Sequence, residues 1–161
     1  MLILLSLLLF AVCIQFYFIY IIFIICDNIG TGHGVGAALN VHEGPHRISP
    51  VLQSQVLLPG MIVSNEPGYY ENGNFGIRIE NLLEIVERPE LGMYGGCGFL
   101  SFQKLTMIPI QKKMIMVELL SDIELQWLNN YHKVINEKVT PYLTSVEAKV
   151  WLDMNTSPII R

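Results

Sequence analysis

Two histidines and two glutamates have side chains whose types and spacing suit metal chemistry: His33, His42, Glu66 and Glu80. An imidazole and two carboxylates are ligands that suit Mn²⁺, Co²⁺ or Zn²⁺. Two carboxylates also supply the negative charge that a pair of divalent ions needs when the ions activate water for hydrolysis. A second histidine that binds no ion could hydrogen-bond the oxyanion that develops on a substrate. The residues alone therefore predict a metal site and nothing finer.

The local sequence around these side chains favours a metal site over simpler interpretations. Taken singly, a histidine is usually structural and a glutamate is usually solvated. However, His33 lies in the run Gly-Thr-Gly-His-Gly-Val-Gly at 30–36, whose small residues allow a tight backbone and leave the imidazole accessible. Pro67 restricts the backbone of Glu66 to extended geometry, which fixes the direction of the carboxylate.

A predicted hairpin can bring the two glutamates together. Asn72-Gly73 is a strong turn signal between two strand-like segments. Glu66 and Glu80 lie at nearly equal distances from this turn, so they can be cross-strand neighbours. On the second strand Arg78 shares a face with Glu80. That charged face is either a solvated sheet surface or the lining of a metal cleft.

Strands and helices are expected in different parts of the chain. Residues 61–63, 75–86 and 99–110 read as strands, after a segment over 27–59 that is rich in turn-forming residues. A helix is expected from Ser121, which with Glu124 fits a capping box, and Pro141 ends or bends it. A shorter helix is expected over 146–152. An apolar stripe at helical spacing marks a core or a subunit contact rather than a ligand site. The stripe comprises Trp127, Leu128, Tyr131, Val134 and Ile135.

An apolar run precedes all of these elements. Residues 1–26 contain no charged side chain and are long enough to cross a bilayer as a helix, for which about 20 residues suffice. The run lacks the basic residues that should precede a signal-peptide core, and the absence of Lys and Arg before Arg47 leaves its orientation open. Either it is a helical anchor that places the protein at a membrane, or it is foreign to the natural protein, which is then expected in the cytoplasm.

Composition excludes several other function classes. The net charge of −4 and the lack of a basic cluster argue against nucleic acid as a partner. Three scattered cysteines make neither a disulfide framework nor a thiolate zinc site. The glycines at 30–36 miss the spacing of a dinucleotide or phosphate loop, and no Gly-x-Ser-x-Gly elbow is present.

Four segments together resemble the peptidase family with the pita-bread fold. In chain order they are GTGHGVG, LNVHEGP, GMIVSNEPGYY and FGIRIEN. The second segment and the tail, LSFQKLTMIPIQKKMI followed by LSDIELQWLNNYHKV, are similar to the eukaryotic Xaa-Pro aminopeptidases. The resemblance covers roughly Gly30 to Trp151. It implies the C-terminal part of an α+β catalytic domain, with antiparallel strands plus helices. We expect the apolar segment over 1–26, the partial catalytic domain over 27–111 and a C-terminal helical extension over 112–161.

The resemblance implies a metal-dependent aminopeptidase that uses a metal-activated hydroxide to remove the N-terminal residue preceding proline. The expected substrate is a peptide with proline in second position. Two divalent ions are implied, Mn²⁺ in the first place and Zn²⁺ or Co²⁺ as alternatives. His33 and Glu66 match metal ligands, and Glu80 matches the carboxylate that bridges both ions. His42 matches a histidine that assists catalysis, and Arg78 matches a supporting arginine.

The sequence departs from the family pattern upstream of His33. The family has two further aspartate ligands there, but Asp27 is the only aspartate before His33. Ile29 stands where the family often has another histidine. We therefore expect negligible turnover from this chain, with at most one ion weakly held. The alternative function is a non-catalytic, membrane-tethered module for peptide binding or dimerisation. A homodimer through the C-terminal helices is left open.

Overall fold

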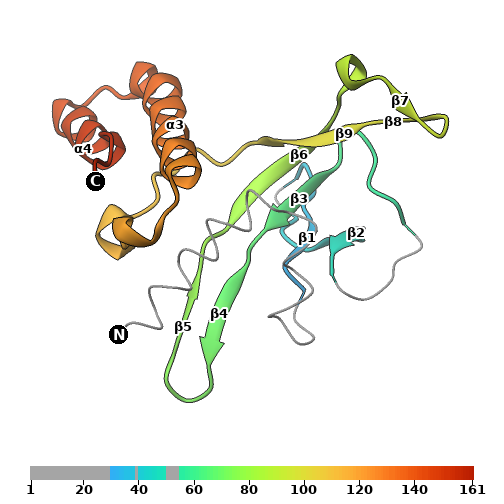
Figure 1. Ribbon diagram of the computed structural model, residues 1–161, viewed down its shortest axis with the longest axis horizontal. Coiled ribbons are helices and arrows are strands. Elements are labelled where there is room, and N and C mark those ends of the chain that lie inside the picture. The colour runs from blue at the N-terminus through green and yellow to red at the C-terminus, as the bar shows by residue number, and fades with distance from the viewer. Residues whose placement is uncertain (1–29, 39, 50–54) are drawn as a thin grey trace. The chain divides into compact units, whose positions relative to one another are not determined.

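The structure is a computed structural model that describes residues 30–38, 40–49 and 55–161. Their α+β fold combines antiparallel strands with helices, as predicted (Figure 1). The described residues divide into two compact units. We call residues 30–68 with 78–106 the sheet unit, and residues 69–77 with 107–161 the helical unit.

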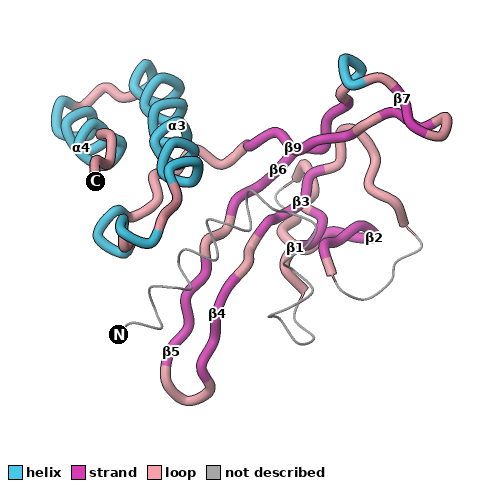
Figure 2. Tube along the Cα trace, in the orientation of Figure 1, coloured by secondary structure: helices cyan, strands magenta, loops and turns pink. Residues whose placement is uncertain are grey.

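A five-stranded sheet, in the order β2-β1-β3-β6-β9, forms the sheet unit (Figure 2). Neighbouring strands of this sheet are antiparallel. Two of the strands, β1 and β2, lie in the segment that was expected to be mostly turns, because its glycines hide the usual strand pattern. The bounds are Gly32–Gly34 for β1, Glu43–Ile48 for β2, Ile62–Asn65 for β3, Asn81–Glu87 for β6 and Leu100–Lys104 for β9.

A small apolar core holds this sheet together. Along β6 buried and half-buried residues alternate, because successive side chains of a strand point to opposite faces. The buried core side chains come from three strands, and Leu57 and Met61 pack against them. The core residues are Ile48, Val63, Leu83 and Ile85.

The predicted hairpin is confirmed. Strand β4 (Gly68–Glu71) pairs with β5 (Phe75–Arg78). Between them the Asn74 N–H donates to the Glu71 carbonyl at 3.0 Å, and Gly73 supplies a φ of 72° that few other residues adopt. A second hairpin, β7 (Met93–Tyr94) with β8 (Cys97–Gly98), belongs to the sheet unit.

The single strand expected over 75–86 is divided, so that prediction was wrong in detail. Strand β5 ends at Arg78, and β6 begins at Asn81. Opposite the break lies Pro67, which has no N–H and cannot donate to a strand ladder. Its carbonyl still accepts a hydrogen bond from the Ile79 N–H at 3.4 Å. Glu66 and Glu80 both lie just outside the regular strands, next to this break.

Two helices form most of the helical unit. Helix α3 (Asp122–Val139) begins at the predicted capping box, in which the Ser121 side chain accepts from the Glu124 N–H and the Glu124 side chain reaches back. It ends at Val139, just before a 3-10 turn (η4, Thr140–Tyr142) that contains Pro141. Helix α4 (Val146–Thr156) is longer than predicted. Three further 3-10 turns are η1 (Pro89–Leu91), η2 (Lys112–Met114) and η3 (Val117–Leu119).

Side chains of helix α3 form hydrogen bonds with the segment after β9, which was expected to continue that strand. The Tyr131 hydroxyl donates to the Ile108 carbonyl at 2.9 Å, and the Ile110 N–H donates to Nε2 of His132 at 3.1 Å. The backbone groups of this segment therefore bond to helix side chains, so the strand predicted to reach residue 110 ends at Lys104. Most of the predicted apolar stripe on α3 is buried, but Val134 is 39% exposed and does not join it.

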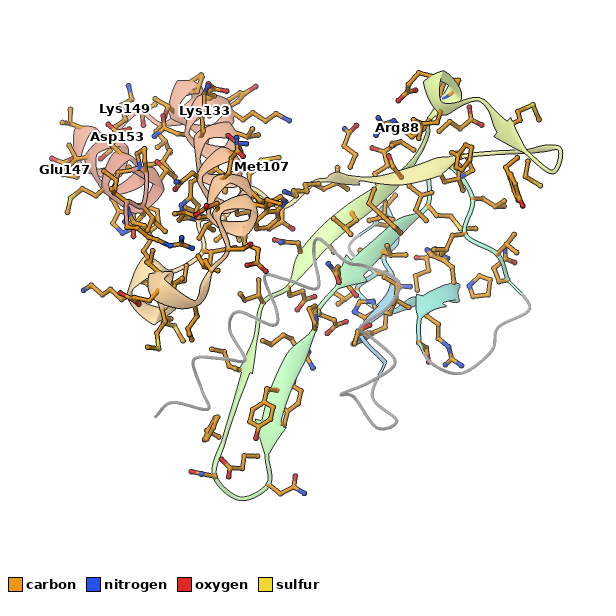
Figure 3. The ribbon with its side chains drawn as sticks, in the orientation of Figure 1. Arg88, Met107, Lys133, Glu147, Lys149 and Asp153 are labelled. Carbon is orange, nitrogen blue, oxygen red and sulfur yellow. The ribbon has the colours of Figure 1, made fainter. Side chains whose placement is uncertain are left out.

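Side chains of α3 and of the chain before it anchor the C-terminal segment. The Asn129 amide pairs with both backbone groups of Ile159, at 3.0 and 2.8 Å. The Lys112 ammonium donates to the Met154 and Ser157 carbonyls, where α4 ends. Charged residues lie along the rest of these helices, as Figure 3 shows for Lys133 on α3 and for Glu147, Lys149 and Asp153 on α4.

None of the helices in the described part of the chain is both long and apolar enough to cross a membrane. The predicted membrane anchor falls on residues 1–26, which lie outside the described residues. The anchor and the two locations derived from it therefore stay predictions.

Candidate metal centre

His33 lies in the middle of β1, and its ring is held in one orientation. Its Nδ1 is 2.9 Å from the carbonyl oxygen of Gly34. Because a carbonyl can only accept, Nδ1 carries the proton and donates it. In the neutral ring, Nε2 then keeps its lone pair free for an ion. A second hydrogen bond of this kind is the usual way in which a metal-binding histidine is oriented.

Glu66 follows β3 directly, and both of its carboxylate oxygens have partners. The Ser64 hydroxyl donates to Oε1 at 2.8 Å. The Arg78 guanidinium donates to Oε2 at 2.7 Å, a charge-assisted hydrogen bond of the stronger kind. Oε1 also lies 3.1 Å from Nε2 of His33. These protein groups alone thus hold the Glu66 carboxylate in one orientation.

Glu80 reaches the same place from the break between β5 and β6. The register of β3 and β6 pairs Asn65 with Asn81, so the next pair along the hairpin sets Glu66 opposite Glu80. His33, Glu66 and Glu80 each offer a ligand atom, and these atoms lie within 4.8 Å of one another. The structure therefore brings together all three residues that the sequence marked as ligands.

The distances suit a divalent ion. Two ligand atoms that are each about 2.1 Å from an ion are about 3 Å apart when they subtend a right angle. The separation of 3.1 Å between the His33 and Glu66 atoms matches that arrangement. When Nε2 is unprotonated, two acceptor atoms face each other there, and a cation between them removes their repulsion. The donor set and its spacing thus fit a metal ion.

His42 and Arg78 lie beside the three candidate ligands. The ring of His42 packs edge-on against the ring of His33, with 4.4 Å between the ring centroids. His42 is exposed, so a bound substrate could reach its ring nitrogens. Arg78 contacts the cluster through its hydrogen bond to Glu66. All five residues singled out in the sequence are therefore at or next to one site.

Close packing of the loop after β1 depends on its glycines. A Cβ on Gly34 would come within 2.6 Å of the His46 ring and would overlap the Glu43 backbone. A Cβ on Gly36 would overlap the Glu43 carboxylate. The His46 Nε2–H donates to the carbonyl of Ile62 on β3 at 2.9 Å, which ties the returning chain to the sheet. The glycine-rich motif thus lets the loop pass close to the histidine ligand.

Sequence reasoning missed two residues that build the site. Ser64 is fully buried and bonds to Glu66, and His46 on β2 bonds to the Ile62 carbonyl of β3. A serine within a strand is common, so nothing in the sequence distinguishes Ser64. The only sequence feature that points to His46 is its short distance from His42 along the chain.

The chain is similar to known peptidases over most of its length. Residues 23–87 match metallopeptidase family M24, and residues 98–159 match the C-terminal region of peptidase M24. Aminopeptidase P2 of Arabidopsis thaliana is 55% identical over 133 residues, which are 82% of this chain and 19% of that protein. A protein of Tuber melanosporum named "Probable Xaa-Pro aminopeptidase P" is 47% identical over 81% of this chain and 22% of its own length.

A solved structure shares the fold. It is X-prolyl aminopeptidase from Caenorhabditis elegans, described as a cytosolic enzyme with a di-nuclear active site. It aligns with a TM-score of 0.70 and 38% sequence identity, over 81% of this chain and 21% of that chain. The present chain thus spans about a fifth of the length of the relatives that it matches.

Proposed function

Because the chain belongs to metallopeptidase family M24, on its Xaa-Pro aminopeptidase branch, we propose that it supplies part of the catalytic centre of a metal-dependent aminopeptidase. The substrate would be a peptide with proline in second position, from which the N-terminal residue is removed. The observation that carries this proposal is the convergence of His33, Glu66 and Glu80 on one point.

The three candidate ligands would together bind divalent ions. The Nε2 lone pair of His33, an oxygen of Glu66 and the exposed Glu80 carboxylate would together hold the ions. When bound, divalent ions supply Lewis acidity for hydrolysis. Mn²⁺, Zn²⁺ and Co²⁺ all suit these donors, and we propose Mn²⁺. With the three candidate ligands that the described residues supply, we propose at most one weakly held ion and negligible turnover.

His42 and Arg78 would assist without binding the ions. His42, next to His33 but exposed, would donate a hydrogen bond to the substrate carbonyl oxygen as negative charge develops on it. Arg78 would hold the Glu66 carboxylate in its ligand orientation through the 2.7 Å hydrogen bond.

A non-catalytic module for peptide binding or dimerisation is the competing function. Such a module would have no need of three converging ligand atoms, so the cluster favours the peptidase. Exposed apolar residues at helical spacing on α4, Val146 (70%), Val150 (52%) and Met154 (68%), would suit a contact with a second copy. That homodimer stays a prediction, which the mass from sedimentation velocity would check.

A chimera tests the catalytic proposal in the context of a full-length relative. Residues 30–161 of this chain replace the matching segment of Arabidopsis Aminopeptidase P2, and cleavage of a short Xaa-Pro peptide is measured with Mn²⁺ present. We expect turnover that a chelator abolishes. We also expect His42→Ala to lower kcat by roughly 10²- to 10³-fold, the usual loss when one oxyanion donor is removed.

Two controls separate a poor chimera from a wrong proposal. The parent enzyme sets the reference rate, and Mn²⁺ binding by the His42→Ala chimera should equal that of the unmutated chimera. A folded chimera that binds Mn²⁺ but cleaves nothing would contradict the assignment of this segment to catalysis. Peptide binding that a chelator leaves unchanged would support the non-catalytic module instead.

A further inference from the structure

We propose that Ser64 is a positioning residue of the metal centre. Its hydroxyl would hold the Glu66 carboxylate and the backbone of His33 at the separation that an ion requires. This inference rests on the proposed metal-binding function of the site. Ser64 itself lies on β3, is fully buried and is not one of the three candidate ligands.

The direction of both hydrogen bonds at Ser64 is fixed by chemistry. The backbone N–H of His33 can only donate, so Oγ of Ser64 accepts from it at 2.9 Å. The Ser64 hydroxyl proton then goes to Oε1 of Glu66, 2.8 Å away, because a carboxylate can only accept. The Ser64 hydroxyl therefore links the backbone of His33 on β1 to the carboxylate of Glu66, and both residues are candidate ligands.

The buried position of Ser64 distinguishes its contribution from that of Arg78. The Arg78 side chain is 42% exposed, so water competes with it and can replace it at Glu66 Oε2. Ser64 has no exposed surface, so water has less access to its hydrogen bond with Glu66 than to the exposed one from Arg78. Loss of the hydroxyl would leave Oε1 free to turn away from Nε2 of His33, which lies 3.1 Å from it.

Mn²⁺ affinity of the whole chain, measured by electron paramagnetic resonance, tests this role. We expect Ser64→Ala to weaken binding about 10- to 100-fold, the usual effect of removing a partner of a ligand. Ser64→Thr, which keeps the hydroxyl, should restore affinity to within about threefold of the original. Thr31→Val is the matched control, because it deletes a buried hydroxyl that has no hydrogen-bond partner among the described residues.

A merely structural role would give a different pattern. In that case Ser64→Ala would lower the melting temperature without Mn²⁺, yet the folded fraction would bind Mn²⁺ as before, and Ser64 would not be a positioning residue. Equal losses in Thr31→Val and Ser64→Ala would also overturn the inference. If His33→Ala, measured alongside, left Mn²⁺ binding unchanged, the proposed site itself would be wrong. Loss in His33→Ala but not in Ser64→Ala would reject the role of Ser64 alone.

Discussion

Gly32→Ala should destabilise the sheet unit by about 3 kcal/mol or more, well beyond the effect of a typical single substitution. A Cβ on Gly32 would overlap the backbone carbonyl of Ser64 and lie 3.1 Å from the Ile48 side chain. Strand β1 is paired with β2 on one side and β3 on the other, so it cannot move away from the overlap. Amide hydrogen exchange of the core residues Val63 and Leu83 would measure the loss of protection.

Gly30→Ala is the matched control for this substitution. Gly30 lies two residues earlier and is exposed, and its nearest neighbour for an added Cβ is the Ile48 carbonyl at an ordinary 3.6 Å. Protection should therefore stay within about 0.5 kcal/mol of the original chain, as at most surface positions. Equal protection in the two variants would contradict the close approach of β1 and β3.

The helical unit should lose about 3 kcal/mol of stability between pH 7 and pH 4 because of His132 alone. Burial lowers the pKa of His132 to about 4, and the nearby charge of Lys112 adds to the effect. An unfolded histidine titrates near pH 6.5, so between these two values the unfolded state binds more protons. Stability is therefore fully present above about pH 6.5 and falls as the pH falls toward 4. Protonation of Nε2 would also break its bond to the Ile110 N–H, 3.1 Å away.

His132→Gln isolates this effect from other titrating groups. The glutamine Oε1 can take the place of Nε2 and accept from the Ile110 N–H, but it does not titrate. Both tryptophans of the chain, Trp127 and Trp151, lie in the helical unit, so urea unfolding followed by their fluorescence reports on this unit. The loss between pH 7 and pH 4 should be smaller in His132→Gln by about 3 kcal/mol. An identical loss in both proteins would show that His132 does not titrate in this window.

The convergence of the three candidate ligands was predictable because their local sequences restrict the backbone. Glycines around His33 and the proline after Glu66 are visible in the sequence, and the Asn72-Gly73 turn sets Glu80 opposite Glu66. The capping box at Ser121 is equally local. Features of this kind depend on a few neighbouring residues, so one sequence is enough to reveal them.

The features that the sequence did not reveal depend on contacts between distant residues. Strand β1 is glycine-rich, and only its pairing with β2 and β3 makes it a strand. Ser64 acquires its importance from His33, 31 residues away. The segment after Lys104 has a strand-like sequence, but its backbone forms hydrogen bonds with the side chains of Tyr131 and His132 instead. Tertiary contacts of this kind override local propensity.

Paramagnetic broadening by Mn²⁺ in nuclear magnetic resonance spectra of this chain tests the metal centre most directly. Small amounts of Mn²⁺ should first remove the amide signals around His33, Glu66 and Glu80, and added Zn²⁺ should restore them by competition. Signals from α4, which carries the acidic residues Glu147 and Asp153, should persist longer. Broadening that began on α4, or that spread evenly over all acidic residues, would contradict a metal centre at His33, Glu66 and Glu80.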